Sequence, residues 1–62
     1  MVMDESEIKK ISIEEFSRLQ YYMQASDKES EAYRIMKKRY KELKVILHSM
    51  GVNLTEIDFI NE

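Results

Sequence analysis

The sequence has no cysteine, no proline and no tryptophan, and only one glycine and one histidine in 62 residues. Without cysteine the chain forms no disulfide, and a single imidazole cannot supply the ligand set of a structural zinc site. We therefore expect no metal and no cofactor. A domain of this size buries only about 60% of the surface that its unfolded chain exposes, so small domains commonly gain stability by association or by tight helix packing.

The scarcity of proline and glycine also excludes most β-rich folds, because tight turns depend on these residues. A hydrophobic fraction of 44% is too high for intrinsic disorder. No apolar run approaches the roughly 20 residues that a membrane-spanning helix needs. The acidic beginning of the chain also lacks the basic and then apolar pattern of a signal peptide. We expect an all-α protein of the cytoplasm with no membrane insertion.

Capping residues predict where the first helix begins. Ser12 is followed three residues later by Glu15, the spacing of a capping box, and an apolar stripe with helical periodicity follows. We predict a helix over residues 12–25. Residues 1–11 are predicted to form an acidic, flexible tail.

A second helix is predicted over residues 27–50. Either Ser26 or Asp27 is suited to cap its start, because both side chains accept hydrogen bonds from free amides of a first turn. The single glycine, Gly51, is placed to adopt the left-handed conformation that ends many helices, with Val52 packing back in a Schellman motif.

A short third helix is predicted over residues 54–61. Two capping pairs fit its start, Asn53 with Glu56 and Thr55 with Asp58. The sequence does not choose between them.

Apolar residues of the second helix alternate at spacings of three and four, as in the a/d seam of a coiled coil. These residues are Tyr33, Met36, Tyr40, Leu43, Leu47 and Met50. The connection to the first helix is short, so the two helices are expected to run antiparallel. Residues 12–62 are therefore predicted to form one small domain, an antiparallel helical hairpin with a short third helix.

The predicted first helix is shorter than the second, so the C-terminal end of the second helix lacks a partner within the hairpin. We expect this apolar surface to be an interface that joins copies of the chain in a dimer or a larger helical bundle, with the dimer favoured. The predicted interface residues are Tyr22, Ile35, Tyr40, Val45, Ile46, Leu47 and Met50.

Residues 32–49 contain six bases and one acid. This charge raises the alternative of a nucleic-acid contact, because phosphates bind clustered cations. The candidate residues are Arg34, Lys37, Lys38, Lys41 and Lys44. Acidic flanks are expected to neutralise this cluster, and the predicted third helix contains acids and no base, which disfavours its use as a DNA-recognition helix.

Nothing in the sequence predicts an enzyme. Neighbouring acids such as Glu14 and Glu15 do not face each other on a helix, and no base is spaced to activate a capping hydroxyl. A phosphate-binding glycine-rich loop is also missing. The predicted function is a non-enzymatic protein–protein interaction module, a regulatory or adaptor protein that self-associates through the apolar face of the second helix. A nucleic-acid-associated accessory protein is the alternative.

Overall fold

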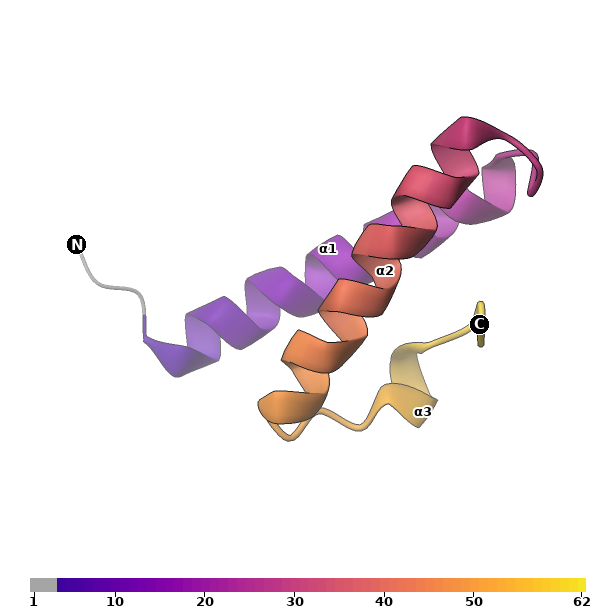
Figure 1. The fold of residues 1–62 in the computed structure, drawn as a ribbon. Coiled ribbons are helices and arrows are strands. Elements are labelled where there is room, and N and C mark those ends of the chain that lie inside the picture. The colour runs from indigo at the N-terminus through magenta and orange to yellow at the C-terminus, as the bar shows by residue number, and fades with distance from the viewer. Residues whose placement is uncertain (1–3) are drawn as a thin grey trace.

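The computed structural model describes residues 4–62 and shows an all-α fold (Figure 1). Helices α1 (Glu5–Ala25) and α2 (Glu31–Ser49) pack antiparallel, and the chain then folds back so that α3 (Leu54–Ile57) lies beside α2. The predicted helical hairpin with a short third helix is confirmed. Within residues 4–62, no helix combines the length and the apolar character needed to cross a bilayer.

Helix α1 begins at Glu5, so the prediction of a start at Ser12 was wrong. The Asp4 side chain accepts a hydrogen bond from the Glu7 amide at 2.8 Å and caps the helix. No glycine or proline interrupts residues 5–11, and extending a nucleated helix costs little. Most of the predicted tail is therefore helical, and its residues 1–3 lie outside the described residues.

Helix α2 begins at Glu31, later than predicted, because Ser30 is its cap. The Ser30 hydroxyl oxygen accepts a hydrogen bond from the Tyr33 amide at 3.1 Å. Asp27, one of the two predicted caps, instead accepts a hydrogen bond from the Glu29 amide at 2.9 Å. Asp27 therefore stabilises the turn between the helices.

Helix α2 ends in the predicted Schellman motif. Gly51 has a φ of +80°, its amide donates to the carbonyl of His48, and the amide of Val52 donates to the carbonyl of Leu47, both at 3.0 Å. Val52 also packs against the core. This motif turns the chain back toward the hairpin and so positions α3.

Helix α3 spans only four residues, although a helix over residues 54–61 was predicted. Asn53 is its cap and accepts a hydrogen bond from the Thr55 amide, so the first of the two predicted caps is confirmed. The helix stops because the amides of Phe59 and Ile60 donate to a side chain of α1 and not to the preceding turn. Residues 58–62, which we call the terminal segment, are not helical.

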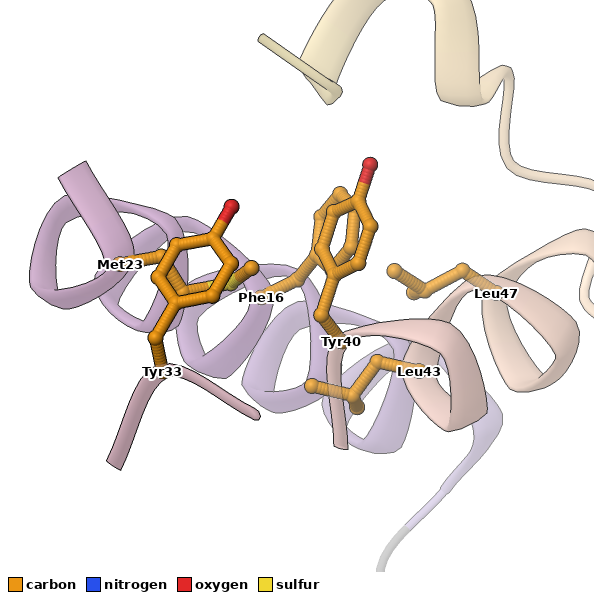
Figure 2. Close-up of a cluster of buried hydrophobic side chains, with 6 residues drawn as sticks. All are labelled: Phe16, Met23, Tyr33, Tyr40, Leu43 and Leu47. Carbon is orange, nitrogen blue, oxygen red and sulfur yellow. The ribbon is translucent and has the colours of Figure 1, made fainter. Parts of the chain in front are cut away.

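The hydrophobic core lies between α1 and α2 (Figure 2). Phe16 stacks on Tyr40 with ring centroids 5.3 Å apart and an interplanar angle of 8°. The partly buried residues Leu54, Ile57 and Ile60 pack against this core. The buried hydrophobic residues are Phe16, Met23, Tyr33, Tyr40, Leu43 and Leu47.

The two long helices lie close together near the turn and diverge toward the start of α1 (Figure 1). The sequence predicted that the end of α2 lacks a partner, because helix 1 was expected to be shorter. In the structure α1 has 21 residues and α2 has 19, and α3 packs near the end of α2. The part of the hairpin that extends beyond its partner is therefore the start of α1.

Candidate functional site

Two of the predicted interface residues, Tyr40 and Leu47, are fully buried in the core of one chain. Their prediction as interface residues was wrong, because both belong to the core of a single chain and leave no surface for another chain. Met50 is partly buried at the end of α2. The remaining predicted residues are exposed.

The exposed residues of α2 do not all point to one side. Val45 is 70% exposed, but it is adjacent to Ile46, and neighbouring side chains on a helix point about 100° apart. Ile35 and Ile46 are separated by three helical turns and so lie on the same side. Val45 therefore does not belong to the surface that Ile35 and Ile46 share.

An ion pair between the two long helices lies on the same side of the hairpin as Ile35 and Ile46. The guanidinium of Arg39 donates to both carboxylate oxygens of Glu15, at 2.9 and 3.1 Å. This hydrogen-bonded pairing lowers the pKa of Glu15 and raises that of Arg39. A bidentate pair has a defined orientation, so it fixes the relative rotation of α1 and α2.

Large apolar side chains surround this ion pair at helical spacings of four and seven residues, which places them on the same face. We call this surface the ion-pair face; it consists of Ile8, Ile11 and Tyr22 on α1 and Ile35 and Ile46 on α2, all exposed. The sequence predicted three of these residues. It missed Ile8 and Ile11, because they were assigned to the flexible tail.

A different set of contacts lies on the opposite side of the hairpin, around Gln20. This side chain is fully buried, and its amide nitrogen donates to the carbonyl of Ile57 at 2.9 Å. Its amide oxygen accepts hydrogen bonds from the backbone amides of Phe59 and Ile60 at 2.8 and 3.0 Å. One buried side chain thus binds the backbone of a segment about 40 residues away in sequence.

Two tyrosine hydroxyls of α2 bind the carboxylates of the terminal segment. Tyr40 donates to Asp58 and Tyr33 donates to Glu62, both at 2.6 Å. Figure 2 shows both hydroxyls pointing the same way, out of the core. The tyrosine rings therefore pack in the core while their hydroxyls face the segment.

Two lysines complete this polar site. The ammonium of Lys44 lies 3.0 Å from Asp58 and 5.1 Å from the ring centroid of Tyr40, and it also donates to the carbonyl of Glu62 at 3.1 Å. The ammonium of Lys37 lies 3.9 Å from the Glu62 carboxylate. The terminal segment is bound by a set of polar groups that we call the cradle: Gln20, Tyr33, Lys37, Tyr40 and Lys44.

The cradle lowers the pKa of the two carboxylates that it binds. Burial acts to raise the pKa of Asp58, but hydrogen bonds from the Tyr40 hydroxyl and the Asn61 amide, together with Lys44, lower it below its usual value. The hydrogen bond from Tyr33 lowers the pKa of Glu62. Both carboxylates are therefore stabilised as anions.

The predicted nucleic-acid residues are divided between different roles. Lys37 and Lys44 bind the terminal segment, and Arg34 lies 3.6 Å from an acid of its own helix. Lys38 and Lys41 are exposed. The five cations therefore do not act as one unoccupied basic surface.

Sequence reasoning missed Gln20, Asp58 and Glu62. Gln20 carried a signal, because its spacing from Phe16 and Met23 places a polar amide in the apolar stripe of α1. The two acids carried no local signal, since their partners lie on α2. No pattern along the chain predicts which lysine a distant carboxylate meets.

Within residues 4–62, no three side chains of the metal-ligating types gather closely enough to hold a metal ion. Comparisons with protein-family models, with curated proteins and with solved structures gave no match.

Proposed function

We propose that the protein is a small interaction module that self-associates through the ion-pair face. The observation that carries this proposal is the set of large apolar side chains exposed around the Glu15–Arg39 pair. Tyr22 and Ile35 are 57% and 63% exposed, although the chain already has a complete core between its helices. Clusters of this kind on a small domain are typical of protein-binding surfaces.

The composition of the face also suits a symmetric dimer. It combines apolar side chains with one acid and one base that are each 43% exposed. In a two-fold interface the same patch occurs on both chains, so such a patch must complement itself in charge. A surface that contains equal positive and negative charge meets that condition. As a regulatory or adaptor protein, the chain would act by presenting or masking this surface.

The test is sedimentation equilibrium of the wild type and of the variants Ile35→Glu and Ile46→Glu across a concentration series. A dimer is expected for the wild type. A carboxylate at either position would have to be buried unpaired, so we expect association to weaken about tenfold or more. Circular dichroism should show the same helicity in all three proteins.

Val45→Glu is the matched control, because it places the same carboxylate on the same helix but outside the ion-pair face. It should leave the dimer unchanged. A wild type that is monomeric at every soluble concentration would contradict the proposal, and so would a dimer that Val45→Glu disrupts equally.

A further inference from the structure

The cradle binds the terminal segment as a receptor binds a peptide. The segment bends at Phe59 and Ile60, and Asn61 has a φ of 57°. Gln20 pairs with the peptide backbone through its carbonyl and amide groups, and two tyrosines and two lysines recognise carboxylates four residues apart. Such a combination recognises the backbone of a bent segment together with a pattern of acidic side chains. A segment of another chain could make the same backbone contacts and the same carboxylate contacts.

The terminal segment is held by polar contacts and by the partly buried Ile60, which packs against the core. Helix α3 contains no buried residue, and none of residues 58–62 is buried as a whole. Phe59 touches the ring of Tyr21, with centroids 5.4 Å apart, but remains 41% exposed. Because residues 58–62 contribute no fully buried residue, while the hairpin contributes the whole buried core, we expect the segment to open at a lower free energy than the hairpin does.

Release of the terminal segment leaves the Gln20 side chain without its hydrogen-bond partners. Its side chain is fully buried when the segment is docked, and all three of its hydrogen bonds go to the backbone of residues 57–60. Release of the segment exposes an amide with unused donors and acceptors, beside two tyrosine hydroxyls and two ammonium groups. The open cradle is therefore a preformed polar site that matches an acidic peptide.

Unfilled space adjoins the docked segment. A hollow of about 420 Å³ lies beside Glu62, and its lining contains both cations and acids: Lys28, Glu29, Glu31, Arg34 and Lys37. A second, of about 390 Å³, lies beside Phe59 and Ile60. A ligand with a larger side chain at the Phe59 position or a longer polar end would gain contacts that the chain's own segment lacks.

We propose that the cradle is a binding site for a bent acidic segment of a partner protein, with an aspartate followed four residues later by a glutamate. In the isolated chain its own residues 58–62 occupy the site. Exchange between two copies would reproduce the same contacts and add the entropic cost of association, so a second copy gains nothing there. A segment of a partner protein that also fills the two hollows gains additional contacts, which offset the cost of association.

This site is independent of the proposed self-association. By helical periodicity Gln20 and Lys44 point about 140° away from Glu15 and Arg39, respectively, so the cradle lies on the side of the hairpin opposite the ion-pair face. Failure of one proposal therefore leaves the other standing.

The test uses a labelled peptide of residues 54–62, LTEIDFINE, and fluorescence anisotropy. In the full chain carrying Asp58→Asn and Glu62→Gln, its own segment occupies the cradle more weakly, so this variant should bind the peptide about tenfold tighter than the wild type does. A peptide with the same two substitutions should bind this variant about tenfold more weakly than the acidic peptide does. Adding Gln20→Met to the variant should abolish binding.

The proposal is overturned if the folded variant binds no tighter than the wild type, or if it binds the neutral peptide equally well. A second measurement covers a variant that fails to fold. In the wild type, the chain's own segment competes with the peptide at an effective concentration on the order of millimolar. Excess acidic peptide should therefore displace the segment and shift the amide resonances of Phe59 and Ile60 toward random-coil positions. Unchanged resonances at saturating peptide would equally contradict the proposal.

Discussion

The Tyr40 hydroxyl donates to Asp58 at 2.6 Å and accepts the amide proton of Glu62 at 3.1 Å. One hydroxyl therefore binds the beginning and the end of the terminal segment. The same residue stacks its ring on Phe16 in the core. Tyr40 thus couples the docked segment directly to the packing of the hairpin.

Tyr40→Phe should separate these two roles. The phenylalanine ring keeps the stacking on Phe16, while Asp58 and the Glu62 amide lose their partner, at a cost of about 1–2 kcal/mol. We expect faster hydrogen exchange at the amides of Phe59 and Ile60, measured by NMR. Hydrogen exchange at the Leu43 amide, in the middle of α2, should accelerate only by the amount that corresponds to the loss in the global free energy of unfolding. Equal acceleration at Leu43 and Ile60 would show that the segment does not open separately from the hairpin.

Docking of the terminal segment should be lost in acid. The pKa values of Asp58 and Glu62 are lowered from 3.8 and 4.5, so their contributions are fully present above those values. The contributions are lost as the pH falls through the lower pKa values of the folded protein. The methyl resonance of Ile60, followed by NMR, should move to its random-coil position below about pH 3.8.

The segment should also be released in alkali. Burial and the hydrogen bond to Asp58 raise the pKa of Tyr40 above 10.0, and the hydrogen bond to Glu62 raises that of Tyr33. Their contributions are complete below pH 10.0 and are lost as the pH rises through the raised values. The Ile60 methyl resonance should therefore be constant between the two transitions. A single transition near pH 7 would contradict this assignment of the titrating groups.

Gly51→Ala should destabilise the fold through the backbone alone. Gly51 has a φ of +80°, and a Cβ built there meets no atom within 4 Å, so the substitution adds strain without a steric clash. We expect a loss of about 1 kcal/mol in the free energy of unfolding, measured by denaturant titration. Lys41→Ala, at an exposed helical position, is the control and should have little effect. Equal stability of Gly51→Ala and the wild type would mean that the Schellman turn does not constrain the fold.

The accuracy of the sequence-based predictions depended on the range of the interaction. The turn at Gly51 was predicted, and Asn53 was one of two predicted caps, because each feature involves residues a few positions apart. The start of α1 was wrong because Ser12 and Asp4 both suit a cap, and the local pattern does not rank them. The Ser12–Glu15 pair then lies inside the helix, where Glu15 binds Arg39 of α2.

The prediction of Tyr40 and Leu47 as interface residues was wrong for a related reason. Periodicity placed Tyr40 and Leu47 on the apolar side of α2, but periodicity alone does not show which apolar residues the rest of the chain covers. In the structure α1 covers these two and leaves Ile35 and Ile46 exposed.

The sequence by itself determined the helical class, the antiparallel hairpin and the turn that ends α2, because helix periodicity, a short connection and a single glycine act locally. Only the tertiary structure decided where residues 58–62 lie. Their path depends on Gln20, Tyr33, Tyr40 and Lys44, whose side chains meet the segment from two other helices. Hydrogen bonds and ion pairs between such distant residues form only when the hairpin has brought them together, so no local sequence pattern predicts them.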